Sequence, residues 1–305
     1  MSAALLALPG QAALASALRT ALAVPDIPLA LREFPDGESH VRIDADVSGR
    51  HVAVLCTLHE PNPRFLPLAF ITDTLRELGA ASVGLVAPYL AYMRQDARFE
   101  PGEAITSTSF ARLVSRQFDW LVTVDPHLHR WRALADIYAI PAVALQAAPL
   151  LAAWIRANVG DAVLIGPDEE SEQWVSTVAA SADCPWRVLK KQRRGDRDVS
   201  VSALPAGELS GRTPVLVDDI ISSGQTMAQT VRQCRAAGSA PAVCMGVHGI
   251  FAPDALEALQ QAGAGRIVTT NSIAHPSNAI DLAPLLAGAV MRFWQPQEQV
   301  PILDR

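Results

Sequence analysis

The chain has little of what defines several common classes of protein. Its four cysteines, Cys56, Cys184, Cys234 and Cys244, are scattered, and none has the paired spacing of a metal site. No uninterrupted apolar segment is long enough to span a bilayer, so a membrane protein is not expected. The sequence has no long basic run and its net charge is −6, so nucleic acid is not an expected partner. We therefore expect buried, reduced thiols and a cytoplasmic protein.

The N-terminus is apolar but lacks the basic residues with which a signal peptide begins. Gly10 and Gln11 interrupt its apolar run early, which indicates a first strand and turn. Half of all residues are hydrophobic (50%) and 18% are charged, values typical of a globular protein rather than a disordered one. A chain of 305 residues exceeds a comfortable single core, so two domains are expected.

Strand-like and helix-like patterns alternate along the whole sequence, which predicts an α/β fold with mostly parallel sheets flanked by helices. The strand candidates are residues 52–58, 82–87, 120–124, 162–165, 215–221, 242–247 and 266–269. Helix candidates between them include residues 65–78, 106–115 and 227–237.

The two halves of the chain echo each other. The segment at residues 78–89 returns in similar form at residues 237–248; each copy follows a helix candidate, and each of these helices follows a strand candidate. Two strand-helix-strand units can also look alike by chance, so the repeat is a hypothesis of duplication. With the join near residues 141–149, it predicts domains at residues 1–147 and 148–305.

The most informative stretch is residues 214–227, Pro-Val-Leu-Val-Asp-Asp-Ile-Ile-Ser-Ser-Gly-Gln-Thr-Met. Its apolar start predicts a buried parallel strand, and its small polar turn leads into a helix. Backbone N–H groups and the hydroxyls of Ser222, Ser223 and Thr226 would meet at that helix N-terminus, where phosphate binds well. Asp218 and Asp219 would then face a hydroxyl-rich sugar, with or without magnesium. The simpler interpretation is an ordinary strand-turn-helix whose aspartates only cap and solvate.

Two segments of the first half are also unusual. Residues 34–43 begin Phe-Pro-Asp-Gly-Glu and place Asp36 and Glu38 on a turn. Residues 89–103 mix Arg94, Gln95 and Asp96 with aromatic side chains. Arginine forks suit a polyphosphate, and aromatic faces suit a purine base. Each segment taken alone is also compatible with a solvated loop.

These motifs, in this order, resemble those of the ribose-phosphate diphosphokinases, also called phosphoribosyl-diphosphate synthetases. The resemblance runs from about residue 34 to residue 285 and leans toward the archaeal-type branch. It implies two tandem phosphoribosyltransferase-like domains, with the ATP side first and the ribose 5-phosphate side second. It also implies transfer of the β,γ-diphosphate of ATP to C1 of ribose 5-phosphate, giving 5-phosphoribosyl 1-diphosphate and AMP.

Further roles are implied only by the resemblance. On the nucleotide side it assigns ATP binding to six residues: Asp36, Glu38, Arg94, Gln95, Asp96 and His127. Asp36 and Glu38 would come from a neighbouring subunit, which implies a homo-oligomer. On the sugar side it assigns ribose 5-phosphate binding to Asp218, Asp219, Ser222, Ser223, Gly224, Gln225 and Thr226.

The resemblance also implies a metal and a catalytic pair. It gives Mg²⁺ as the cofactor, near His127 and Asp168, and Lys191 and Arg193 as the mobile catalytic pair. Lys190 is the neighbouring alternative to Lys191. Without the resemblance, His127 would be read as a structural histidine and residues 190–197 as a solvated charged loop.

The chain departs from the family pattern at two places on the sugar side. Residues 169–174 read Glu-Glu-Ser-Glu-Gln-Trp where the family has a glycine pair, and Gln225 occupies a position expected to need a positive φ or close ligand approach. These departures leave open a different sugar acceptor, or a catalytically weak, regulatory paralogue. A phosphoribosyltransferase is disfavoured because it needs neither the two nucleotide segments nor a duplicated half.

Overall fold

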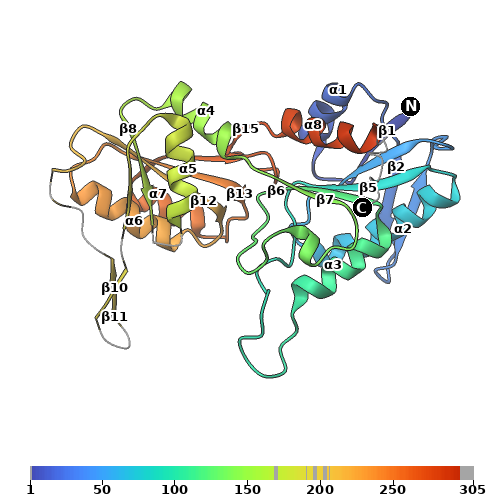
Figure 1. The fold of residues 1–305 in the computed structure, drawn as a ribbon, viewed down its shortest axis with the longest axis horizontal. Coiled ribbons are helices and arrows are strands. Elements are labelled where there is room, and N and C mark those ends of the chain that lie inside the picture. The colour runs from blue at the N-terminus through green and yellow to red at the C-terminus, as the bar shows by residue number, and fades with distance from the viewer. Residues whose placement is uncertain are drawn as a thin grey trace, which may run out of the picture. The chain divides into compact units, whose positions relative to one another are not determined.

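A computed structural model describes residues 2–167, 171–189, 191–194, 198–201, 205 and 207–295 (Figure 1). The chain forms two compact units. One comprises Met1–Leu145 with Ala283–Arg305, and the other comprises Gln146–Leu282.

The first unit contains a five-stranded parallel sheet in the order β1-β4-β5-β6-β7 and a separate β2–β3 hairpin. Its elements are β1 (Ala3–Ala7), α1 (Ala12–Leu22), β2 (Leu29–Glu33), β3 (Ser39–Ile43), β4 (His51–Leu55), α2 (Pro61–Glu77), β5 (Ser82–Ala87), α3 (Thr106–Gln117), β6 (Trp120–Val124), the 3₁₀ turn η1 (Leu134–Asp136), β7 (Ala142–Leu145) and α8 (Ala283–Trp294).

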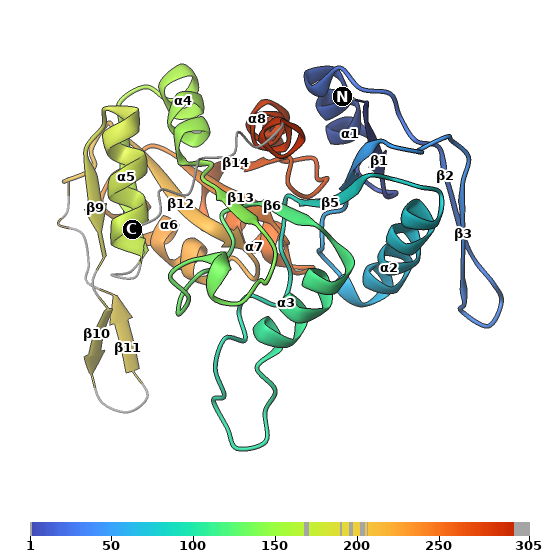
Figure 2. The same cartoon turned by 45° about the vertical axis from the view of Figure 1, so that its right-hand side comes forward.

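Helices cover both faces of this sheet, with α2 and α3 on one side and α1 and α8 on the other (Figure 2). The central strands are therefore buried on both faces, which explains their continuous apolar sequences. In α3 the buried side chains of Phe110, Ala111 and Val114 recur with helical periodicity and pack against the sheet.

The second unit contains a six-stranded sheet in the order β15-β14-β13-β12-β8-β9, whose strand pairs are all parallel, and a separate β10–β11 hairpin. Its elements are α4 (Ala148–Asn158), β8 (Ala162–Gly166), α5 (Glu172–Ala182), β9 (Trp186–Val188), β10 (Lys191–Arg194), β11 (Asp198–Val201), β12 (Thr213–Ile221), α6 (Gln225–Ala236), β13 (Ala242–Gly249), α7 (Ala255–Ala262), β14 (Ala264–Thr270) and β15 (Asn278–Ile280).

The core of the second unit lies between its sheet and the pair α6 and α7. Met227, Val231 and Cys234 form the buried stripe of α6 and recur with helical spacing. Leu259 of α7 joins the same cluster. This packing fixes the start of α6 against the carboxyl end of β12.

The expected repeat is present in the order of elements. The first half runs β1-α1, hairpin, β4-α2-β5-α3-β6-β7-α4, and the second half runs β8-α5-β9, hairpin, β12-α6-β13-α7-β14-β15-α8. The sheet orders β1-β4-β5-β6-β7 and β8-β12-β13-β14-β15 also correspond, with β9 added at one edge. The predicted α/β fold with two tandem repeats is thus confirmed.

The closing helix of each repeat belongs to the other unit. α4 ends the first repeat but lies in the second unit against α5, and α8 ends the second repeat but lies in the first unit against α1. The division into domains at residues 147 and 148 stays a prediction, because spatial contacts do not establish which segments fold independently.

Candidate active site

The carboxyl end of β12 carries the two neighbouring aspartates of the stretch 214–227. Asp218 and Asp219 are both half-buried, and the Asp219 backbone N–H donates to Asp218 Oδ1 at 2.9 Å. The connection Ser222–Gly224 follows, and α6 begins at Gln225. The first N–H groups of a helix have no partner inside the helix, so they are available to an anion. The strand-turn-helix that the sequence predicted is confirmed.

Gly224 is the residue that makes this turn. Its φ is +67°, and a Cβ atom built there would lie 3.3 Å from Leu259 Cγ. An L side chain at this position would therefore be strained and would crowd α7. Gln225 is the first residue of the helix and does not have a positive φ. The expectation of a positive φ at Gln225 is wrong, because Gly224 makes the left-handed turn one residue earlier.

Asp36 and Glu38 lie on the turn of the β2–β3 hairpin, and both are exposed. The Glu38 N–H donates to Asp36 Oδ1 at 3.2 Å, and Gly37 has a φ of +88°. Phe34 is beside them and is 37% exposed. The guanidinium carbon of Arg32 lies 4.4 Å from the centre of the Phe34 ring. The turn thus presents two carboxylates to solvent, beside a partly exposed Phe34.

Arg94, Gln95 and Asp96 follow β5 and have different environments. Arg94 is exposed, while Gln95 Oε1 accepts a hydrogen bond from the Thr106 hydroxyl at 3.1 Å. Asp96 is buried, with its side chain only 4% exposed, and its Oδ1 pairs with Arg130 Nε at 3.3 Å. Its Oδ2 is buried without a partner among the described residues.

His127 follows the carboxyl end of β6 and is half-buried. Asp125, between them, has a φ of +34°. The His127 and His129 rings are stacked with their centres 5.8 Å apart. Because Arg130 pairs with Asp96, the segments after β5 and β6 meet at the same edge of the sheet. Arg130 was not predicted from the sequence, because an ion pair between distant segments leaves no local pattern.

The backbone of Lys191 and Arg193 lies in β10, where the two residues pair with Val201 and Val199 of β11. The charged run that would be read as a loop without the family resemblance is a hairpin there. Lys190 and the predicted metal residue Asp168 lie outside the described residues, as do Glu169 and Glu170. Glu172 begins α5 and is exposed.

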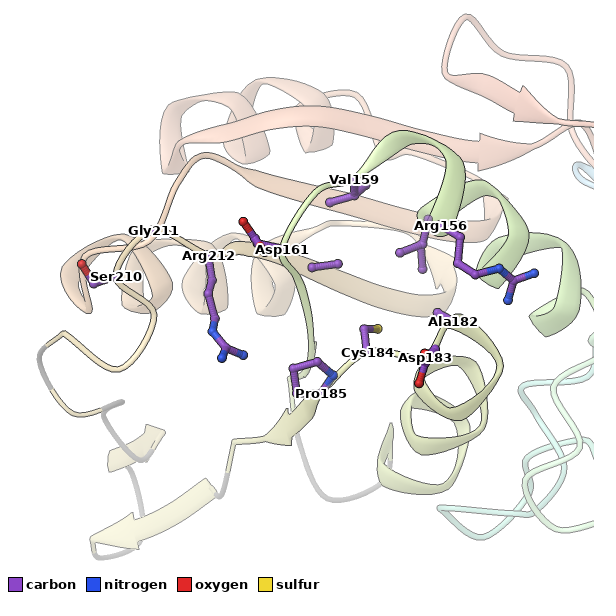
Figure 3. A pocket seen from close by; sticks show the side chains of 12 residues that line it. Arg156, Val159, Asp161, Ala182, Asp183, Cys184, Pro185, Ser210, Gly211 and Arg212 are labelled. Atoms are coloured by element: carbon purple, nitrogen blue, oxygen red, sulfur yellow. The ribbon is translucent and has the colours of Figure 1, made fainter.

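A cavity of about 700 Å³ lies in the second unit (Figure 3), at the amino ends of β8 and β12, whereas the turn Ser222–Gly224 follows the carboxyl end of β12. It is lined by residues at the ends of α4 and α5 and at the start of β8, among them Arg156, Asp161, Asp183 and Cys184. Ligands of open parallel sheets bind at the carboxyl ends of the strands. This cavity is therefore not the candidate active site.

Among the described residues, no cluster of three or more His, Cys, Asp or Glu side chains is arranged to hold a metal ion. No helix in that part of the chain is both long and apolar enough to cross a bilayer.

Comparison with known proteins gives the family. A model of the N-terminal domain of ribose phosphate pyrophosphokinase matches residues 3–117, and a phosphoribosyl transferase domain model matches residues 133–281. The ribose-phosphate pyrophosphokinase of Methanopyrus kandleri is 35% identical over 260 residues, which cover 84% of this chain and 88% of the relative. The enzyme of that name from Methanosarcina acetivorans is 31% identical, with 93% and 98% covered.

A solved structure agrees with these relatives. The crystal structure of phosphoribosylpyrophosphate synthetase from Mycobacterium smegmatis matches with a TM-score of 0.83 and 25% identity, covering 96% of this chain and 99% of that one. Most of the similar curated proteins are archaeal, in line with the branch that the motifs indicated. The chain belongs to the ribose-phosphate pyrophosphokinase family.

Proposed function

We propose that this protein transfers the β,γ-diphosphate of ATP to C1 of ribose 5-phosphate, forming 5-phosphoribosyl 1-diphosphate and AMP. The observation that carries the proposal is the connection between β12 and α6. Two aspartates near the end of β12 are followed by a turn at Gly224 and then by the N-terminus of α6. Family membership supplies the reaction class, and the turn supplies a place for a sugar phosphate.

On the sugar side, the turn holds the 5-phosphate. Backbone N–H groups of Gly224, Gln225 and Thr226 and the hydroxyls of Ser222, Ser223 and Thr226 are its donors in this proposal. Asp218 and Asp219 accept hydrogen bonds from the ribose 2- and 3-hydroxyls and so fix the orientation of the ring. A ring fixed in this way presents its C1 hydroxyl to the donor in one direction.

On the nucleotide side, Arg94, Gln95, Asp96 and His127 line the ATP site of the same chain. Asp36 and Glu38 bind the adenine of a neighbouring subunit, so the active protein is a homo-oligomer. The exposed hairpin turn that carries these carboxylates supports this assignment.

Magnesium is the proposed metal, placed near His127 and Asp168. Mg²⁺ prefers oxygen ligands, which the Asp168 carboxylate would supply, whereas His127 offers a nitrogen. Asp96 Oδ2, buried without a partner among the described residues, provides one more oxygen on the nucleotide side. When bound, the ion would neutralise phosphate charge. ATP as a substrate and free thiols at all four cysteines favour the cytoplasm as the compartment.

In the proposed reaction, the C1 hydroxyl attacks the β-phosphorus in line with the departing AMP oxygen. The new bond joins the C1 oxygen to the β-phosphorus, the bond from that phosphorus to the AMP oxygen breaks, and the hydroxyl proton is released. Lys191 and Arg193 offset the negative charge that develops around the transferred group. Positioning and charge neutralisation supply the rate, and the site excludes water so that ATP is not hydrolysed.

A different sugar acceptor is the second candidate, and the run of carboxylates at residues 169–172 favours it because these charges would repel a sugar phosphate. A catalytically weak, regulatory paralogue is the third. The helical Gln225 weakens both, since its backbone adds no strain to the turn.

The test is AMP release from ATP and magnesium, with and without ribose 5-phosphate, with the sugar product identified by mass. We expect AMP to appear only with the sugar, one for each 5-phosphoribosyl 1-diphosphate formed. No AMP with ribose 5-phosphate, together with normal ATP binding, would contradict the proposal. A panel of other sugars would then separate the second candidate from the third.

A further inference from the structure

The start of the sugar-phosphate turn is held by the segment that follows β13. The N–H groups of Ile250 and Phe251 donate to the Ile221 carbonyl at 3.1 and 3.0 Å. The Ala252 N–H donates to the Ser222 carbonyl at 3.0 Å. Three hydrogen bonds therefore join this segment to the two residues where the turn begins. Any shift of the segment moves the turn with it.

Phe251 stands out within this segment because its backbone is left-handed, with a φ of +42°. A phenylalanine rarely adopts this conformation, so its surroundings must hold it there. One support is Gly249, where an added Cβ would lie 2.5 Å from Phe251 Cε2. The Phe251 ring thus lies over the bare Cα of Gly249.

The second support is His275, in the connection between β14 and β15. Its imidazole packs against the Phe251 ring with centres 4.4 Å apart and planes at 35°. Both side chains are half-buried, and Phe251 also packs against the core of the second unit. The histidine ring therefore closes the pocket that holds Phe251.

Hydrogen bonds fix the orientation of His275. The Ser277 N–H donates to its Nδ1 at 3.1 Å, and the Ser277 hydroxyl lies 2.7 Å from the same atom. Because a backbone N–H can only donate, Nδ1 accepts, and the proton of the neutral ring is on Nε2. Burial also lowers the pKa of His275 from its ordinary value, which favours the neutral form.

The network continues onto the sheet. The Thr269 hydroxyl lies 2.7 Å from the Ser277 hydroxyl, and Asn278 Nδ2 donates to Thr269 Oγ1 at 2.9 Å. Because His275 Nδ1 accepts, the Ser277 hydroxyl donates to it and the Thr269 hydroxyl donates to Ser277. The donors therefore run in one direction from Asn278 to His275. This chain of bonds ties the imidazole to β14, an internal strand of the sheet that pairs with β13 and β15.

We propose that His275 and Phe251 are positioning residues for the sugar phosphate. The β14-anchored His275 holds Phe251, and Phe251 holds the start of the turn at Ile221 and Ser222. A turn held in place before binding loses less conformational freedom when the ligand arrives, so its affinity is higher. This inference rests on the proposed function, since it assigns ribose 5-phosphate to that turn.

The test compares His275→Ala with His51→Ala. His51 is a matched control, because its Nδ1 also lies 2.8 Å from a serine hydroxyl, that of Ser82, but in the first unit at the amino end of β4. We expect His275→Ala to raise the KM for ribose 5-phosphate roughly tenfold, with kcat and the KM for ATP within about twofold. The control variant should leave all three unchanged.

Ser277→Ala is the second variant, for use if His275→Ala fails to fold. It removes only the hydroxyl and leaves the Ser277 N–H, so we expect a smaller rise in the same KM, about threefold. Equal changes in both KM values, a change confined to kcat, or an equal effect of His51→Ala would overturn the inference.

Turnover by the unsubstituted protein is measured first, because its absence overturns the proposed function and not this inference. In that case calorimetric Kd values for ribose 5-phosphate replace the KM values in the same comparison. If the unsubstituted protein binds no ribose 5-phosphate, the inference is overturned as well.

Discussion

In each repeat, a central strand runs through a short connection into a helix. In the first repeat β4 runs through residues 56–60 into α2, and in the second β12 runs through residues 222–224 into α6. The second connection offers hydroxyls, a glycine turn and free helix N–H groups. In the first connection, Cys56, Thr57 and Leu58 are fully buried.

The start of α2 is also unsuited to phosphate. Pro61 and Pro63 lie in its first turn and lack the N–H groups that an anion would need. Glu60 precedes them, with a φ of +52°, and adds a carboxylate beside the helix N-terminus. The same topology thus gives the proposed phosphate site in one repeat and a buried connection in the other. The difference lies in a few residues of the connection rather than in the fold.

The largest expected effect comes from removing the carboxylates of β12. The double substitution Asp218→Asn with Asp219→Asn keeps the shape of the side chains, but it removes both charges and replaces one acceptor oxygen of each carboxylate with a donor NH2 group. We expect kcat/KM for ribose 5-phosphate to fall on the order of 100-fold. Steady-state kinetics at saturating ATP give this value, and a loss below about threefold would contradict the assignment of these residues.

A smaller effect is expected at the turn glycine. Gly224→Ala places a Cβ at a φ of +67° and 3.3 Å from Leu259 Cγ, so the turn must shift. We expect the KM for ribose 5-phosphate to rise roughly tenfold, since this strain costs about 1–2 kcal/mol. The matched control is Gly238→Ala, also at positive φ but with open space around it, after α6. If the two variants raise this KM equally, the turn geometry is not the cause.

The buried connection between β4 and α2 is tested through the effect of its residue His59 on the pH dependence of stability. Burial, and then the charge of Arg64, lower the pKa of His59, while Glu60 raises it less. Because the folded-state pKa lies below the ordinary 6.5, the unfolded chain binds the proton more readily. Stability linked to His59 is therefore full above pH 6.5 and is lost as the pH falls toward the lowered value.

His59→Gln should accordingly flatten the fall in the free energy of unfolding between about pH 7 and about pH 5.5. Urea unfolding of both proteins across that range measures the slope. Identical slopes would mean that His59 does not carry this dependence.

The smallest effect is expected at Gln225. Gln225 is the first residue of α6, so its backbone is already helical, and its side chain is exposed. Gln225→Gly should therefore change the KM for ribose 5-phosphate by no more than about fivefold, because the added backbone freedom costs at most about 1 kcal/mol. A tenfold fall in that KM would instead mean that the glutamine side chain obstructs the ligand.

Much of the fold could be predicted because the central strands are buried on both faces. β5 and β6 have the predicted bounds, and β12 and β13 were predicted to within two residues at each end. The short elements were not predicted. β15 has three residues, too few for a periodic pattern, and its pairing depends on β14. The hairpin at β10 and β11 resembles a solvated charged run, because its strands pair only with each other.

The candidate site was predictable where the motif is continuous in sequence. The turn after β12 falls within one such stretch, so its strand, glycine and helix start could all be anticipated. The exception is Gln225, where a positive φ was expected. The positive φ lies one residue earlier, at Gly224, and its position depends on how α6 packs against α7. Arg130 pairs with Asp96, and His275 packs against Phe251. The members of each pair lie far apart in sequence, so these contacts could be found only in the structure.

Calorimetric titration of ribose 5-phosphate tests the difference between the two connections most directly. The unsubstituted protein and the double variant Asp218→Asn with Asp219→Asn would be titrated under the same conditions, with magnesium and a non-hydrolysable ATP analogue present. We predict one ribose 5-phosphate bound per chain, and its loss in the variant. Two molecules per chain, or one that persists in the variant, would contradict the account.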